Sequence, residues 1–442
     1  MPKPKLNLFD FTMIMVTLVI GMGIFRTPAN VAATSPTPAV FFAAWVFGGI
    51  VAICGSLTFA EIGSRYPITG GYYKIFSYAY HPSIAFGINC IIMVSNVSAV
   101  AGVAIIGAEY IAKVLMPHAT NIKNVQIAIA IISILILYAV NLAGLKMSAR
   151  TQNILTVIKI CFIVLLISPV FFYTDTSHAS NAIIIANPTL REYIKAFGIA
   201  LVAVSFTYGG YQQTINFGQE VKDPSKNIPR GIIYGLFIII ILYFSINYAY
   251  YKVIGFQTLK SSTAIADDMA SHLFGNTAGN LVSILLFLSV LAYINAQLMC
   301  EPRVLEAMSD EGAIPKFFGE RTKNKNVPFI SLSFLAIASI LIVFKAETFD
   351  QIMSFSIFLD CFGMILSAAA IFKLRKNTAH LNGTGIYQMK LFPLLPIVFM
   401  LTYAFVATVI FVDKPYTGLL GVGILMAFIV IFFIADALKK KK

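Results

Sequence analysis

The stretch Ile20-Gly21-Met22-Gly23-Ile24-Phe25 places two glycines in the middle of a long apolar run. The run extends from Leu8 to about Ala33, which is long enough to cross a bilayer as a helix at about 1.5 Å per residue. Glycine weakens a helix by about 1 kcal/mol relative to alanine, and backbone groups freed inside a membrane need other partners. The stretch therefore predicts a broken helix whose ends line a cavity, although close packing between two helices is an alternative use of the same glycines.

A second interrupted run, Ser205-Phe206-Thr207-Tyr208-Gly209-Gly210-Tyr211, favours the broken helix. Gly21 lies in the first apolar run and Gly209 in the sixth, so the two interruptions are five spans apart. Because five is odd, the two interrupted helices enter the membrane from opposite faces. Broken helices at corresponding positions of two oppositely oriented halves are typical of transporters whose substrate site lies between the halves.

The composition indicates an integral membrane protein. Of the 442 residues, 58% are hydrophobic and 12% are charged, whereas a soluble domain carries about 25% charged residues. The mean hydropathy is +0.83. Apolar runs predict an all-α protein with twelve membrane spans near residues 8–34, 38–62, 83–115, 125–143, 152–173, 192–218, 229–254, 275–300, 328–345, 351–373, 391–412 and 416–437.

The net charge of +13 is explained by topology. When the N-terminus is placed in the cytoplasm, most of the 32 Lys and Arg residues fall in inner loops and tails, which is the positive-inside pattern. We therefore expect a multi-pass protein of the cytoplasmic membrane with both termini inside. Nucleic-acid binding is not expected, and no cleavable signal peptide is predicted. Scattered cysteines and histidines predict no disulfide framework, no metal site and no cofactor.

Several ionisable residues lie within the predicted spans. Arg26, one turn beyond the glycine break, and Glu109 are at similar depth, and an intramembrane carboxylate is by default a functional hypothesis. We predict that they pair for structure or gating, with direct substrate contact as the alternative. Glu61 is expected to pair with a nearby arginine or to cap backbone rather than to couple transport. Asp360 is expected to be a hydrogen-bond partner in helix packing.

The sequence leaves two roles open for Lys159. Lys159 lies about two turns from the cytoplasmic end of its span, so its ammonium could reach the headgroups. The alternative is a buried amine that carries a proton or serves as a fixed cation in place of a metal ion.

The segment from Glu301 to Pro315 is charged, and a solvated cytoplasmic hairpin explains most of it.

Helix ends that meet near the membrane midplane define a type of ligand. Exposed N–H groups of the first span would hold an anionic group, and exposed carbonyls of the first and sixth spans would hold a cationic one. A zwitterion with both charges on adjacent carbons fits both ends.

Several motifs occur in the order found in one known family. They are Gly21-Met22-Gly23-Ile24-Phe25, Ala60-Glu61-Ile62-Gly63 with Pro67 and Gly70-Gly71-Tyr72-Tyr73, Lys159 in T-x-x-K, Phe206-Thr207-Tyr208-Gly209-Gly210-Tyr211, Lys222-Asp223-Pro224 with Asn227-Ile228-Pro229-Arg230, and Ser289 to Arg303 followed by Gly312 and Pro315. With this set the chain resembles the amino acid-polyamine-organocation transporters, in particular their L-type and cationic amino acid permeases.

The resemblance implies one transmembrane domain over residues 1–442 with two inverted five-helix repeats, about 8–173 and 192–373, and two additional helices over about 391–437. It implies secondary transport by alternating access. The substrate-binding residues that it implies are Val19, Ile20, Gly21, Met22, Gly23, Ile24, Phe206, Thr207, Gly209, Gly210 and Tyr211. In this pattern the N–H groups of the first span meet the substrate carboxylate, Phe206 is an aromatic lid, and Lys159 resembles a stand-in for a sodium ion with a coupling role.

Three departures from the family pattern bear on selectivity. Met22 replaces the usual serine, Gly209 the usual acid and Tyr211 the usual tryptophan, so side-chain selectivity does not carry over. We expect a neutral L-amino acid as substrate, moved by proton symport or by exchange. The alternatives are a polyamine or other organic cation, an amino acid sensor, and a membrane-embedded enzyme. The sequence does not identify a protein partner.

Overall fold

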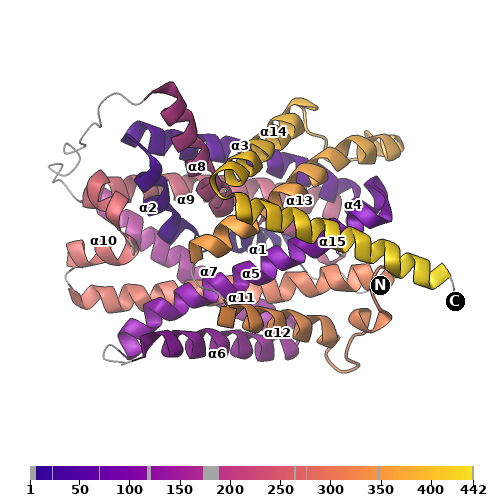
Figure 1. Cartoon of the computed structure of the whole chain (residues 1–442), viewed down its shortest axis with the longest axis horizontal. Coiled ribbons are helices and arrows are strands. Elements are labelled where there is room, and N and C mark those ends of the chain that lie inside the picture. The colour runs from indigo at the N-terminus through magenta and orange to yellow at the C-terminus, as the bar shows by residue number, and fades with distance from the viewer. Residues whose placement is uncertain are drawn as a thin grey trace.

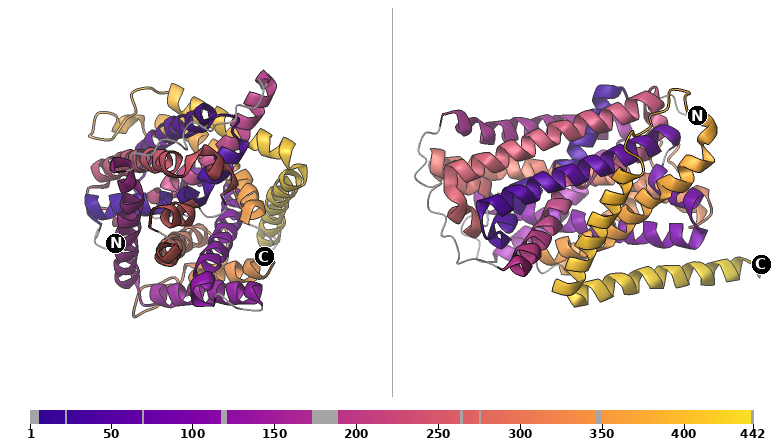
Figure 2. Two further views of the ribbon diagram at one scale, coloured as in Figure 1. Left: turned by 90° about the vertical axis from the view of Figure 1, so that its left-hand side faces the viewer. Right: turned by 90° about the horizontal axis from the view of Figure 1, so that it is seen from above.

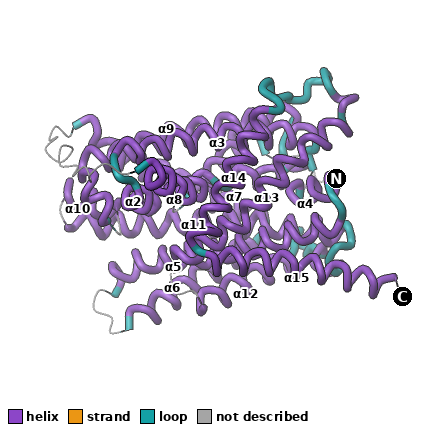
Figure 3. Tube along the Cα trace, turned by 45° about the horizontal axis from the view of Figure 1, so that its top comes forward, coloured by secondary structure: helices purple, strands orange, loops and turns teal. Residues whose placement is uncertain are grey.

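The computed structural model describes residues 6–21, 23–68, 70–116, 121–172, 189–262, 265–274, 276–345 and 349–440. Helices joined by short loops make up this part of the chain, and no strand occurs within it (Figure 3). The described N-terminal residue Leu6 forms a single isolated bridge with Val221. The predicted all-α class is therefore confirmed for the described residues.

The α-helices follow one another along the chain as α1 Leu8–Val19, α2 Gly23–Thr34, α3 Pro38–Arg65, α4 Gly71–Ala79, α5 Pro82–Leu115, α6 Ile122–Leu142, α7 Leu145–Ile167, α8 Leu190–Tyr208, α9 Pro224–Ser261, α10 Ile265–Phe274, α11 Asn276–Asp310, α12 Phe329–Lys345, α13 Phe349–Asn377, α14 Leu394–Asp413 and α15 Pro415–Lys440. Five 3-10 helices join them: η1 Ser168–Phe171, η2 Tyr211–Asn216, η3 Gly218–Glu220, η4 Lys316–Gly319 and η5 Ala379–Leu381.

Eleven helical stretches in the described residues are long and apolar enough to cross a membrane, and a shorter apolar helix covers Phe329–Phe344. The protein is thus a multi-pass membrane protein, and each predicted span has a matching helix. Helices α7 and α11 extend beyond their predicted spans, in each case at an end that is rich in polar residues. α7 begins at residue 145 rather than 152, and α11 ends at 310 rather than 300. Lys, Arg, Gln and Glu are good helix formers, so a helix continues beyond the apolar segment that hydropathy detects.

Both glycine-marked interruptions are present. α1 ends at Val19, Ile20 has non-helical backbone angles, and α2 begins at Gly23. Met22, between them, lies outside the described residues. α8 ends at Tyr208, after which Gly210 adopts a positive φ of 115° and η2 follows. At Gly210 the positive φ is possible because glycine has no Cβ to obstruct such a conformation.

The broken helices lie inside the helical body. α2 packs against α8 and α9, while the long helices α5 and α11 pack against each other and extend along the body (Figure 1). α15 lies at the outside and has few buried residues. The start of α1 and the end of α15 lie at the same end of the molecule, and α10 lies at the opposite end (Figures 1 and 2).

A buried ionic network joins helices at the end that contains the termini. Glu61 is fully buried and accepts hydrogen bonds from Arg65 Nε at 2.8 Å, Arg375 Nε at 2.8 Å and the Met389 N–H at 2.9 Å. Arg65 also donates to the Thr378 hydroxyl at 2.9 Å. The expected pairing of Glu61 with arginine is confirmed. Separation of α3 from α13 would leave these buried charges without partners, which is strongly destabilising. The network therefore holds the two helices together.

Candidate functional site

A cavity lies where the two broken helices meet. The volume of this cavity is about 60 Å³. α1, α2, α5, α8, η2, α11, α13 and α14 all contribute to its wall. The lining residues are Leu18, Val19, Gly21, Gly23, Asn96, Ala99, Val103, Ser205, Phe206, Thr207, Gly209, Gly210, Gln212, Gln213, Tyr293, Gln297, Ser356, Ile357, Asp360, Met364 and Tyr403.

The sequence-predicted site residues fall into two groups. Those that line this cavity are Val19, Gly21, Gly23, Phe206, Thr207, Gly209 and Gly210. Ile20 and Ile24 are fully buried in the surrounding core, and Tyr211 lines a separate small pocket beside Gly48 and Tyr208. The ring of Tyr211 packs edge-on against Phe59, with ring centroids 6.0 Å apart. Met22 is outside the described residues.

Helix ends of opposite polarity face the cavity. The first N–H groups of α2 have no partner within the helix, and the aligned peptide dipoles place partial positive charge there. The last carbonyls of α1 and α8 carry partial negative charge. The Val19 carbonyl accepts hydrogen bonds from the Gly21 N–H at 2.8 Å and from the Tyr243 hydroxyl at 3.0 Å, which uses both of its lone pairs. The Phe206 carbonyl accepts the Gly209 N–H at 3.3 Å.

Glycines permit the close approach of the two breaks. A Cβ on Gly210 would lie 2.2 Å from the Leu18 carbonyl oxygen at the end of α1. A Cβ on Gly23 would lie 2.8 Å from the Thr207 hydroxyl oxygen in α8. Both distances are far below van der Waals contact, so a larger residue at either position would force the two backbones apart.

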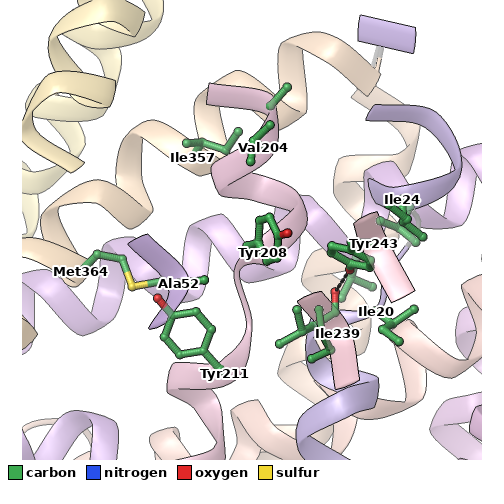
Figure 4. Packing of buried hydrophobic residues seen from close by; sticks show 14 of the residues in the cluster. Ile20, Ile24, Ala52, Val204, Tyr208, Tyr211, Ile239, Tyr243, Ile357 and Met364 are labelled. Carbon is green, nitrogen blue, oxygen red and sulfur yellow. Dashed lines mark hydrogen bonds between the residues drawn. The ribbon is translucent and has the colours of Figure 1, made fainter. Parts of the chain in front are cut away.

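Tyr243 of α9 joins the two breaks through its hydroxyl, whose single hydrogen is shared between two carbonyl oxygens. Its hydroxyl lies 3.0 Å from the carbonyl oxygen of Val19 in α1 and 3.0 Å from that of Thr207 in α8. The side chain is fully buried beside Ile20, and its ring lies 5.1 Å from that of Tyr208 between centroids (Figure 4). The last turns of both broken helices are therefore held by one hydroxyl group.

A family model described as amino acid permease matches residues 6–435. The chain belongs to this family. The permease is accordingly a transporter and not an enzyme. It is 29% identical to the serine/threonine exchanger SteT of Bacillus subtilis (strain 168) over 401 residues, which cover 88% of this chain and 87% of that protein. It is 24% identical to the Asc-type amino acid transporter 1 of Mus musculus and to the large neutral amino acids transporter small subunit 2 of the same species. Each comparison covers 98% of this chain and 81% of the relative.

Lys159 of the permease is buried, with 1% of its surface exposed. Its ammonium nitrogen donates a hydrogen bond to the Ile20 carbonyl, at the end of α1. Three residues earlier in α7, the Thr156 hydroxyl lies 2.5 Å from the Thr17 hydroxyl of α1. The side chain is therefore directed at the helix break and not at the headgroups. Its coupling role remains a prediction.

Arg26 of α2 and Glu109 of α5 form an ion pair, as predicted. Arg26 Nη1 is 3.6 Å from Glu109 Oε2, and the two side chains are 24% and 39% exposed. The pair joins α2 to α5. Its part in gating remains a prediction.

A polar network in the cavity wall was not expected from the sequence. Gln213 Nε2 donates to Asn96 Oδ1 at 3.2 Å, and Asn96 Nδ2 donates to Glu301 Oε1 at 2.7 Å. Asp360 lines the same cavity. The expectation of a solvated hairpin from residue 301 is wrong at its start, because α11 continues to Asp310 and Glu301 is 2% exposed. The side chain lies on the helix face that packs against α5.

The described residues form no cluster of side chains that could bind a metal ion. Within the ranges that the structure describes, no three His, Cys, Asp or Glu side chains gather closely enough to hold a metal ion. The polar atoms that face the cavity are instead backbone groups, amides, hydroxyls and one carboxylate.

Proposed function

We propose that this permease moves amino acids across the cytoplasmic membrane by alternating access, as an exchanger or a proton symporter, with neutral L-amino acids as substrates. The observation that carries the proposal is the cavity in which the start of α2 and the ends of α1 and α8 meet. Such a cavity presents N–H donors and carbonyl acceptors a few ångströms apart, which suits the carboxylate and ammonium groups of one zwitterion.

In this proposal the substrate carboxylate binds the N–H groups at Gly23 and Ile24, with Met22 beside them. The ammonium group binds carbonyls at the end of α8, namely those of Phe206 and Gly209. The Val19 and Ile20 carbonyls, which already accept hydrogen bonds, contribute partial negative charge to the same region. Phe206 covers the bound substrate, while Tyr211 supports the pocket from behind.

The relatives support the substrate class. The names of the three relatives state serine and threonine exchange, Asc-type amino acid transport and large neutral amino acid transport. The first supports exchange as a mode of transport. We assign Lys159 to coupling, because its hydrogen bond to the Ile20 carbonyl links α7 to the break in α1. A change in its charge would alter that link.

We also propose the architecture that this function needs: twelve spans, two inverted five-helix repeats and both termini in the cytoplasm. The common end at which α1 starts and α15 finishes supports an even number of crossings (Figure 2). Labelling of single cysteines introduced at each end of the molecule in intact cells tests the orientation.

The experiment is counterflow in proteoliposomes. Purified permease is reconstituted, the vesicles are loaded with one unlabelled L-amino acid, and entry of labelled amino acids is measured for a panel that includes serine, alanine, leucine and arginine. We expect counterflow for neutral members, and competition by free amino acids but not by their methyl esters. Equal competition by methyl esters would refute the carboxylate site. Absence of counterflow and of uptake for every amino acid would refute the function.

Organic cations are a second candidate because Asp360 faces the cavity. A carboxylate in a binding cavity attracts ammonium groups, whereas a polyamine has no carboxylate for the start of α2. Putrescine and cadaverine are therefore added to the panel. Counterflow by these amines without counterflow by amino acids would favour the second candidate.

A further inference from the structure

Two acidic side chains, one in the cavity wall and one directly behind it, form no salt bridge among the described residues. Glu301 in α11 is 2% exposed, and Asp360 in α13 lines the cavity. Both acids lie beside the same turn of α5: Asn96 donates to Glu301 at 2.7 Å, and Ser95 donates at 3.0 Å to the Ser356 carbonyl of α13, one turn before Asp360. Among the described residues, no lysine, arginine or histidine forms a salt bridge with either of them.

The basic groups on neighbouring helices are engaged elsewhere. Arg303, on the turn of α11 that follows Glu301, pairs with Glu220 at 3.2 Å. Lys74 of α4 pairs with Glu311 at 3.2 Å, and Lys159 of α7 donates to the Ile20 carbonyl. The titratable groups that face the two acids are Tyr72, Tyr293, Cys300, Cys361 and Tyr403, all neutral near pH 7.

Unpartnered oxygen atoms are a second and independent feature of this cavity. Gln213 and Gln297 both line it, and they are 5% and 3% exposed. The Oε1 atom of each has no hydrogen-bond donor among the described residues. Buried acceptors without donors are costly, so the cavity has a surplus of acceptors that a ligand with N–H or O–H groups would satisfy.

We propose that Glu301 and Asp360 form a proton-binding pair that carries one proton with each transported amino acid. Two neighbouring carboxylates in a water-poor interior do not both remain ionised without a cation, and one shared proton removes half of their charge. A carboxylate oxygen takes the proton from water on the side to which the cavity is open, forming an O–H bond. The same bond breaks on the other side, and the proton returns to water there.

The hydrogen-bond network links this pair to the substrate. Gln213 follows the break in α8, its Oε1 atom is free to accept from a substrate N–H, and its Nε2 atom donates to Asn96. Asn96 in turn donates to Glu301. Substrate binding therefore repositions a donor to the carboxyl group, and the charge of that group in turn acts on the substrate site. Lys159 donates to the Ile20 carbonyl at the break in α1. In this proposal the acid pair carries the proton and Lys159 links α7 to the break, so gradient-driven uptake needs both.

This inference rests on the proposed function, and the experiment separates the two. Permease is reconstituted with the pH dye pyranine inside, and the panel amino acid with the fastest counterflow is added outside without substrate inside. For the wild type we expect the lumen to become more acidic during uptake, and an inward proton gradient to accelerate uptake about tenfold, a typical coupling factor. Failure of wild-type counterflow would refute the proposed function before the inference is tested.

Three variants test the pair. Glu301→Gln and Asp360→Asn are expected to lose both the acidification and the acceleration by the gradient. Because Asp360 lines the cavity, counterflow is measured separately for each variant. Glu306→Gln is the matched control, because Glu306 lies on the same helix but pairs with Arg321 outside the cavity at 2.6 Å. We expect it to behave as the wild type. Acidification of wild-type size in both Glu301→Gln and Asp360→Asn would overturn the proposal.

Loss of counterflow is also informative. If either variant elutes as monodisperse protein but shows no counterflow, proton uptake on substrate addition is measured in weakly buffered detergent solution. Proton uptake by the wild type and none by the variant supports the pair. Equal proton uptake by both, or loss of substrate binding in both acid variants, overturns the proposal, because the carboxyl groups would then serve substrate binding and not proton transport.

Discussion

Replacement of Tyr243 by phenylalanine tests whether one hydroxyl holds the two helix breaks together. The variant removes the single O–H donor that the Val19 and Thr207 carbonyls share, and leaves the ring in place. A hydrogen bond contributes about 1 kcal/mol, and a buried carbonyl left without a donor costs about 1–3 kcal/mol. The Val19 carbonyl keeps the Gly21 N–H, so the main loss is at Thr207. We expect the free energy of unfolding to fall by about 2 kcal/mol.

The matched control is Tyr250→Phe. Tyr250 lies on the same helix and is equally buried, but its hydroxyl has no hydrogen-bond partner among the described residues. Its removal is expected to leave stability unchanged or to raise it. Unfolding in mixed micelles with increasing SDS measures both variants, and counterflow measures transport. Equal stability and equal counterflow for Tyr243→Phe and Tyr250→Phe would refute the role of the Tyr243 hydroxyl.

Three other predictions use the same assays. Gly210→Ala is expected to lower counterflow about 100-fold, as a displacement of about 1 Å in a site does, because its Cβ would meet the Leu18 carbonyl. Gly312→Ala is the control, since Gly312 also has positive φ but open space around it; equal effects would contradict the steric explanation. Lys159→Ala is expected to lose gradient-driven uptake and to keep counterflow, and an equal loss of both would make the lysine structural. Arg26→Gln and Glu109→Gln are expected to change transport, with a stability loss of about 1 kcal/mol or less for a partly exposed pair. Wild-type transport and expression in both would exclude a gating role.

The sequence predicts the class and the position of the helices well. Hydropathy is a local property, and a helix that faces lipid must be apolar over its whole buried length. The two interruptions are also predictable, because Gly21, Gly23, Gly209 and Gly210 stand in apolar runs that would otherwise continue as helices. The helix edges at residues 145 and 310 are harder to predict, because polar helix formers continue a helix beyond the apolar segment that hydropathy detects.

The candidate site shows where local patterns stop being informative. Seven of the expected positions at the breaks line the cavity, whereas Ile20 and Ile24 lie in the surrounding core. Tyr211 lies in a neighbouring pocket against Phe59. Tyr243 gave no signal, because a tyrosine in a long apolar helix is typical of ordinary packing. Its contact with Val19 joins residues 224 positions apart in the chain.

The sequence by itself determined an α-helical membrane protein with two glycine-marked helix breaks, since lipid exposure and backbone freedom depend on the residues of one segment. Only the tertiary structure decided which side chains surround those breaks. Glu301 follows an apolar run and precedes a charged loop, so its local sequence suggests solvent. In the structure it is buried and accepts a hydrogen bond from Asn96, 205 positions away. The environment of such a side chain is set by the helices that pack around it, and no pattern within its own segment specifies those neighbours.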